Sequence, residues 1–206
     1  MDCGPSRSEA KNTGPAAAVR HGTGALPMFG IVMKVGPHTG MSLDDIVESK
    51  FKEEARLGVH YWGYSGTSCR PRRVLEFVAY VLLRQRTPPS LLLLETQSDY
   101  ASEKIGRIGT FSTDQREYRG FGAPVQLQGA QYAFVACGLQ RVDQELRLDT
   151  YSVMGGRNDG RPLSQHLRYR VNKAFVRHGS EPASLESSRL ACLAQLAEPY
   201  VIWLGT

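Results

Sequence analysis

Residues 70–98, "RPRRVLEFVAYVLLRQRTPPSLLLLETQS", set the architecture that the rest of the chain must fit. The first part is apolar over most of a helical circumference and has Pro71 at its first position, which predicts a mostly buried helix over 70–86. Pro88 and Pro89 end that helix. The run 90–98 is short, apolar and bounded by turn residues, which predicts a central strand. The chain therefore needs a sheet with helices packed on it.

The stretch before this segment predicts one strand and one helix. Residues 28–36 are β-rich and end in a Gly-Pro turn. Residues 39–58 have a good N-cap in Ser42, acidic residues Asp44 and Asp45 in the first turn, and Gly58 at the C-terminal end. A helix between Ser42 and Gly58 follows from these signals.

The stretch after this segment predicts strands and then two more helices. Residues 131–140 and 145–154 indicate an antiparallel hairpin. Apolar residues at helical spacing predict a third helix over 163–179 and a fourth over 184–198. Shorter strands are expected at 107–113, 124–129 and 199–204.

These elements indicate an α+β (mixed α/β) fold: one mixed, largely antiparallel sheet with about four helices packed on it. Residues 1–26 lack periodicity and are rich in Gly, Pro, Ser and Ala, so we expect a disordered N-terminal tail. Residues 27–206 are expected to form a single globular domain.

Composition narrows the class of partner. The chain of 206 residues has a formal net charge of +5 and a pI of about 9.1, which favours an anionic partner. The four cysteines form no CxxC pair, and the histidines lack metal-binding spacing, so we expect neither a metal nor another cofactor. The sequence shows no signal peptide and no apolar run of membrane-spanning length, so we expect a cytoplasmic protein without a membrane partner.

The stretch "HYWGYSGTSCRPRRV", residues 60–74, combines glycines, hydroxyls, aromatics and arginines before the helix that starts at Pro71. Free N–H groups and the positive end of the helix dipole favour an anion there, arginines pair with phosphate oxygens, and aromatic rings stack on bases. The same residues also serve as ordinary caps, turns and core anchors. The candidate ligand-binding residues are Tyr61, Trp62, Tyr64, Ser65, Thr67, Ser68, Arg70, Arg72 and Arg73.

Cys69 and His60 allow a catalytic alternative. A thiol at a helix start beside arginines is expected to have a lowered pKa, and His60 is a candidate base if the loop folds back. The competing interpretation is a buried, inert cysteine, which is common for free thiols.

A second basic stretch lies between residues 157 and 177. On the predicted third helix its charges fall opposite an apolar stripe, which is typical of a basic amphipathic helix or of an ordinary solvated face. The candidate residues of this secondary basic surface are Arg157, Arg161, Arg170, Lys173 and Arg177. Glu95 and Asp99, after the central strand, are candidates for an acid/base group; Glu95 is also a candidate arginine partner.

Three functions remain open at this point. The leading hypothesis is an anion-binding domain that recognises a nucleotide or a nucleic-acid phosphate at the Gly/Ser/Arg-rich loop. One alternative is an enzyme that acts on a phosphorylated or nucleotide substrate through Cys69 or His60. The other is a non-catalytic basic subunit or adaptor of a protein or ribonucleoprotein complex.

Overall fold

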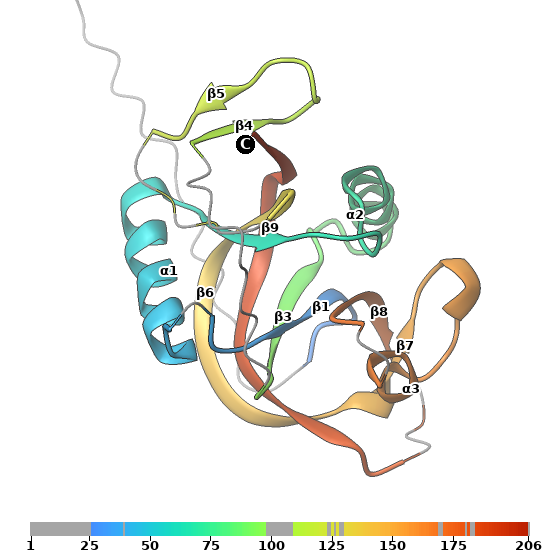
Figure 1. Ribbon diagram of the computed structural model, residues 1–206. Coiled ribbons are helices and arrows are strands. Elements are labelled where there is room, and N and C mark those ends of the chain that lie inside the picture. Colours follow the sequence, from blue (N-terminus) through green and yellow to red (C-terminus); the bar gives the residue numbers. More distant parts are fainter. Residues whose placement is uncertain are drawn as a thin grey trace, which may run out of the picture.

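The computed structural model describes residues 26–38, 40–97, 109–122, 125, 127, 130–168, 171–179, 181 and 184–205. These residues form one large sheet and three α-helices (Figure 1). The strands are β1 (Phe29–Val35), β2 (His60–Tyr64), β3 (Ser90–Glu95), β4 (Thr110–Ser112), β5 (Arg119–Gly120), β6 (Tyr132–Arg147), β7 (Tyr151–Val153), β8 (Lys173–His178) and β9 (Ser187–Gly205). The helices are α1 (Leu43–Leu57), α2 (Pro71–Gln85) and α3 (Leu163–Leu167), with 3-10 turns η1 (Leu148–Thr150) and η2 (Gly156–Asn158).

The nine strands pair in the order β2-β6-β9-β3-β1-β8-β7, with β4 on a further part of β9 and β5 on β4. Within the described residues, β1 and β3 form the one parallel pair, and the other pairs are antiparallel. Parallel neighbours need a long crossover. The crossover from β1 to β3 contains α1, β2 and α2, and therefore both long helices.

The central strand β3 is buried on both faces of the sheet. Leu91, Leu92, Leu93 and Leu94 are all 0% exposed. Because side chains alternate along a strand, Leu91 and Leu93 join one core cluster while Leu92 and Leu94 join another. The apolar run at 90–95 was correctly predicted to be a central strand.

Both long helices pack on the Leu91 and Leu93 face. Val47 of α1 and Val74 and Phe77 of α2 lie in the same buried cluster as these leucines. The opposite face is covered by α3 and η1, whose leucines pack against Leu92 and Leu94. The sheet is thus the middle layer, and its central strands are shielded from water on both sides.

The ends of α1 and α2 agree with their sequence signals. Ser42 caps α1 by accepting a hydrogen bond from the Asp45 N–H at 3.1 Å, and the Asp45 carboxylate accepts from the Ser42 N–H at 3.2 Å. This reciprocal capping box satisfies two otherwise free donors. Gly58 ends α1 with φ of 75°, the left-handed conformation that glycine adopts at low cost. Pro71 opens α2, as predicted.

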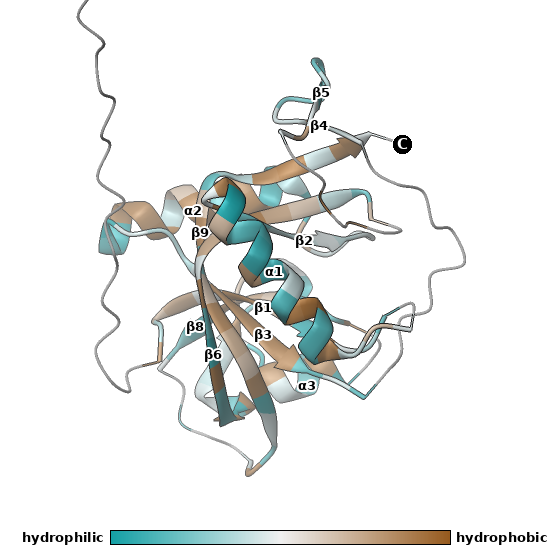
Figure 2. Cartoon of the chain, turned by 90° about the vertical axis from the view of Figure 1, so that its left-hand side faces the viewer, coloured by the Kyte–Doolittle hydropathy of each residue, from teal (hydrophilic) through white to brown (hydrophobic). Residues whose placement is uncertain are grey.

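Polar contacts fix α1 on the strands beneath it. The Glu54 carboxylate accepts hydrogen bonds from the N–H groups of Gly138 and Leu139, at 2.6 and 3.1 Å, where β6 is irregular. The neighbouring Glu53 accepts from the Tyr61 N–H at 2.6 Å and pairs with buried Lys50. Figure 2 shows that α1 is mostly hydrophilic, unlike the strands behind it. Hydrogen bonds to strand backbone therefore supplement the small apolar contact of this helix.

The predicted third and fourth helices are wrong. Helix α3 covers only Leu163–Leu167, and Lys173–His178 form strand β8, which pairs with β1. The segment expected as the fourth helix belongs to the 19-residue strand β9. Its Leu, Ala, Gln and Glu residues have high helix propensity, but pairing with β3 and β6 overrides that preference. The overlooked signal is an alternation of buried side chains with period two: Leu190, Cys192, Ala194 and Leu196.

The predicted hairpin between 131–140 and 145–154 is also wrong. One 16-residue strand, β6, runs through most of both segments and pairs with β2 and β9 instead. Three register shifts along the β6–β9 pair mark bulges, which bend strands and increase their twist. Figure 1 shows β6 and β9 sweeping together through the molecule as long curved ribbons.

The expected fold class needs the same correction. In place of an α+β fold with about four helices, the described residues form a strand-dominated fold with one mixed nine-stranded sheet and three α-helices, one of which has five residues. Residues 1–25, the bulk of the expected tail, lie outside the described residues.

A pair of leucine substitutions tests this layering. Leu93→Ala removes a fully buried side chain from β3 and should lower the free energy of unfolding by about 2–5 kcal/mol. Leu83→Ala makes the same chemical change on the outer face of α2, where the residue is 88% exposed, and should cost about 0.5 kcal/mol or less. Urea unfolding at equilibrium measures both. Equal losses would contradict the layering.

Candidate functional site

The aromatic residues of the 60–74 stretch belong to strand β2 and alternate between its two faces. Trp62 and Tyr64 are each 4% exposed and lie in the main core. The Tyr64 ring stacks on Phe134 with centroids 4.2 Å apart. Tyr61 points to the other face and packs edge-on against Phe121. These rings therefore stabilise the sheet, and burial withholds Trp62 and Tyr64 from a ligand's base.

The loop from Ser65 to Arg70 is held to the sheet at three points. The Tyr64 hydroxyl donates to the Cys69 carbonyl at 2.7 Å. Buried Lys173 of β8 donates from Nζ to the Ser65 carbonyl at 3.1 Å, and the Ser65 hydroxyl accepts from the Gln131 N–H at 3.1 Å. Cys69 has a positive φ of 57°, which turns the chain into α2. The base of the loop is thus fixed by long-range contacts.

The start of α2 carries the arginines that the sequence singled out. Arg70 is the N-cap residue, and its side chain makes no capping hydrogen bond. The side chains of Arg72 and Arg73 are 90% and 73% exposed and both reach Glu76, at 3.2 and 3.0 Å. Thr67 is exposed and Ser68 half-buried. Three arginines and two hydroxyl residues therefore lie in one short segment around the helix start, with one carboxylate opposing them.

Cys69 and His60 do not form a nucleophile and base pair. Cys69 is 6% exposed, and burial raises the pKa of its thiol to about 12, although Lys173 acts in the opposite direction. The lowered pKa considered for this thiol is therefore wrong, because desolvation outweighs the nearby positive charge. His60 lies beyond the other end of β2, under α1, where its Nδ1 is 2.9 Å from Glu54. A buried, inert Cys69 was the competing interpretation, and it matches these surroundings.

His60 belongs to a buried polar cluster. It is 0% exposed, and burial lowers its pKa to about 4, an effect that Glu54 partly offsets and the more distant Lys50 adds to. Its Nε2 and the indole Nε1 of Trp62 have no hydrogen-bond partner among the described residues. Such orphaned buried donors or acceptors cost free energy. This cluster makes the region under α1 sensitive to protonation.

The secondary basic surface does not form an amphipathic helix. Lys173 and Arg177 lie on strand β8, where Lys173 is buried and Arg177 is exposed. Arg157 lies in η2 and Arg161 just before α3, and both are exposed. Arg170 and Asp99 lie outside the described residues. Of this set, the structure links Lys173 to the first site through its contact with Ser65.

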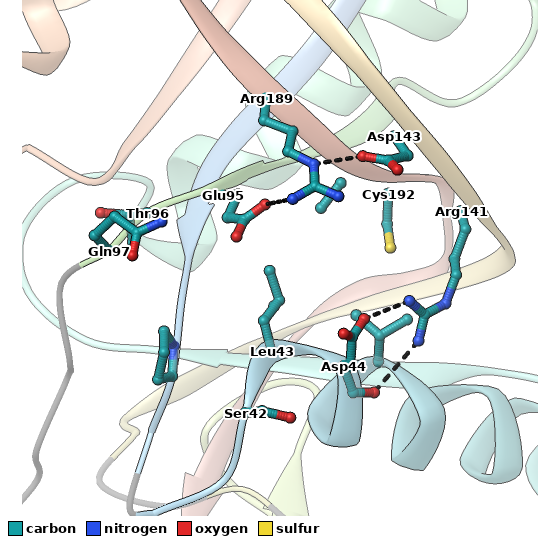
Figure 3. A pocket seen from close by; sticks show the side chains of 13 residues that line it. Ser42, Leu43, Asp44, Glu95, Thr96, Gln97, Arg141, Asp143, Arg189 and Cys192 are labelled. Atoms are coloured by element: carbon teal, nitrogen blue, oxygen red, sulfur yellow. Dashed lines mark hydrogen bonds and ion pairs between the residues drawn. The ribbon is translucent and has the colours of Figure 1, made fainter.

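A cavity of about 320 Å³ lies elsewhere, at the start of α1 (Figure 3). Arg189 of β9 contacts Glu95 at 2.9 Å and also pairs with Asp143 of β6. Arg141 of β6 contacts Asp44 of α1 at 2.5 Å. Glu95 was considered as an arginine partner from the sequence, and Arg189 is that partner. Arg141, Asp143 and Arg189 were missed, because isolated charges on strands give no local signal that they converge.

The described residues give no further indication of a metal or a membrane span. Among them, no group of three or more His, Cys, Asp or Glu side chains is arranged to hold a metal ion. No helix in the described ranges is long and apolar enough to cross a membrane. No family model matches the chain, and searches of curated proteins and of solved structures likewise found no match.

The burial of Cys69 predicts its reactivity. In the native protein, iodoacetamide at about pH 8.5, near the pKa of a free thiol, should leave Cys69 unmodified because its raised pKa and burial keep it protonated and inaccessible. Partly exposed Cys137 should react faster, and both should react in urea. Peptide mapping by mass spectrometry measures each site. Rapid native labelling of Cys69 would contradict its placement.

The lowered pKa of His60 predicts a loss of stability in acid. The unfolded chain binds a proton near pH 6.5, whereas folded His60 resists protonation down to about pH 4. Between these values the unfolded state holds more protons, so stability falls as the pH falls and levels off below about pH 4. Urea unfolding at about pH 7 and pH 5 should show a larger loss for the wild type than for His60→Gln, which cannot titrate. Equal losses would rule out this contribution.

Proposed function

We propose that the start of α2 binds the phosphate groups of a nucleotide or nucleic acid. The observation that carries the proposal is the group of exposed arginines around a helix start with no side-chain cap: Arg70, Arg72 and Arg73. The first N–H groups of a helix lack partners within the helix, and its dipole places positive charge at this end. Anions bind at such helix starts for both reasons.

The charges around this helix start favour an anion further. Three arginines face one carboxylate, Glu76, which leaves a formal excess of two positive charges (three minus one). Each guanidinium has five N–H donors, so Arg72 and Arg73 keep donors beyond those used for Glu76. Glu76 holds both side chains near the helix start, where a phosphate with its stronger charge can compete for them.

The fixed base of the loop adds support. Lys173 and Tyr64 hold the backbone at Ser65 and Cys69, so ligand binding does not have to order the lower part of the loop. Preorganisation of this kind lowers the entropic cost of binding. Thr67 and Ser68 supply further hydroxyl donors beside the arginines.

The proposal concerns phosphate more than base. Trp62 and Tyr64 are buried, so the stacking role expected of them has no support from their positions. Contacts to phosphate carry little sequence information. We therefore expect binding that depends strongly on salt and weakly on base sequence.

Two other expectations stay predictions: a cytoplasmic location and membership of a protein or ribonucleoprotein complex. An enzyme that uses Cys69 with His60 gains no support, since the two side chains lie in separate buried surroundings.

Fluorescence anisotropy with a labelled single-stranded oligonucleotide tests the proposal. Arg70→Ala combined with Arg72→Ala should lower affinity by about tenfold or more and reduce the salt dependence by about two counterions' worth. ATP should compete if a nucleotide suffices as ligand.

The matched control is Arg84→Ala combined with Arg86→Ala, which removes the same charge at the other end of α2. It should change affinity much less, because those arginines lie away from the helix start. Equal losses in the two double variants would indicate diffuse charge attraction instead of a site. Absence of oligonucleotide and ATP binding by the folded wild type would refute the proposal.

A further inference from the structure

The cavity at the start of α1 is formed by segments that are distant in the sequence. Its walls come from the beginning of α1, the ends of the parallel strands β1 and β3, and the strands β6 and β9. Its volume of about 320 Å³ lies at the lower end of the range of small-molecule sites. The ends of adjacent parallel strands are a frequent place for ligands, because the connections diverge there.

Charges of alternating sign surround this cavity. Arg189 uses Nε for Asp143 and Nη1 for Glu95, which leaves its Nη2 with no partner among the described residues. Glu95 uses Oε2 for Arg189 and keeps Oε1 for a further donor. Arg141 is turned toward Asp44 on the other side (Figure 3). Arginine and carboxylate groups with remaining hydrogen-bonding capacity therefore lie next to each other.

These charges disfavour simple ions as ligands. Three carboxylates and two guanidiniums give a formal net charge of −1 (two minus three), so an isolated phosphate or sulfate would meet more repulsion than attraction. Both arginines are already engaged with carboxylates, which a divalent cation would have to displace. A ligand that offers both signs in a small space can instead add to the existing pattern without breaking it.

The spacing of the unused groups limits the ligand. Nη1 of Arg189 and Oε2 of Glu95 are 2.9 Å apart, so the free Nη2 and Oε1 of the same two side chains are close neighbours. A ligand that uses both must carry its carboxylate and its ammonium group near each other, as an α-amino acid does across a single carbon atom. Charge-assisted hydrogen bonds of this kind are among the stronger polar contacts.

The floor of the cavity is apolar. It is made by Leu43 and Val47 of α1 with Ala191 and Cys192 of β9. Cys192 extends its sulfur into the space between the two arginines (Figure 3), and burial raises the pKa of this thiol to about 11, so it presents a neutral group. An apolar side chain suits this surface, whereas a charged one would lose its hydration there.

We propose that this cavity binds a free α-amino acid with an apolar side chain. The ammonium group of the ligand lies beside Glu95, its carboxylate beside Arg189, and its side chain against Leu43 and Cys192. The site is separate from the start of α2 and involves none of its arginines, so the two proposals stand or fall independently.

Isothermal titration calorimetry with L-leucine tests the proposal on the full chain. N-acetyl-leucine and leucinamide, which lack the ammonium and the carboxylate respectively, should each bind about tenfold more weakly or worse. L-aspartate should bind more weakly than L-leucine because of the apolar floor. Equal binding of a blocked derivative, or no binding of L-leucine by the folded protein up to about 10 mM, would overturn the proposal.

Two variants and a control locate the site. Glu95→Gln keeps the shape of the side chain and should weaken L-leucine binding about tenfold, whereas Glu48→Gln, an exposed residue of α1 outside the cavity, should not. Leu43→Ala should weaken binding of L-leucine but not of glycine. Thermal melting checks that each variant is folded. Equal effects of Glu95→Gln and Glu48→Gln, or an equal effect of Leu43→Ala on both ligands, would place binding elsewhere.

Discussion

The complete burial of four consecutive leucines is the constraint on which this structure depends. Leu91 to Leu94 lie on a strand, so their side chains alternate between two faces, and both faces must exclude water. A helix pair on one side and short helical segments on the other meet that requirement. At about 25 cal/mol for each Å² of apolar surface removed from water, four such side chains contribute several kcal/mol. No single layer on β3 would achieve this.

The crossover that covers one face of β3 also creates both proposed sites. The chain leaves β1, forms α1 at the end of the parallel pair, and thereby roofs the cavity with Leu43 and Val47. It then passes through β2 at the edge of the sheet and turns at Cys69 into α2, whose start carries the exposed arginines. Polar contacts of Glu53 and Glu54 with strand backbone hold α1 in this position. The architecture and the sites therefore share the same contacts.

Burial divides the 60–74 stretch into two parts with different roles. Up to Tyr64 the chain is a strand, and its aromatic rings are part of the core. After Cys69 the side chains of Arg70, Arg72 and Arg73 point into solvent. Lys173 joins the two parts, because its ammonium group lies 5.3 Å from the Tyr64 ring centroid and also bonds the Ser65 carbonyl. A segment that seemed uniform in composition is thus half scaffold and half surface.

The sequence alone determined the elements whose signals are local. Caps at Ser42 and Gly58, a proline at the start of α2 and the uninterrupted leucines of β3 act within a few residues, and each gave the correct element. The tertiary structure decided β8, β9 and the single long β6, because their strand form comes from pairing with distant partners that overrides helix propensity and turn signals. It also decided the cavity, whose Asp44, Glu95, Arg141 and Arg189 come from separate elements. Charges so far apart in the chain meet only when the sheet pairs its strands, so no local pattern could announce them.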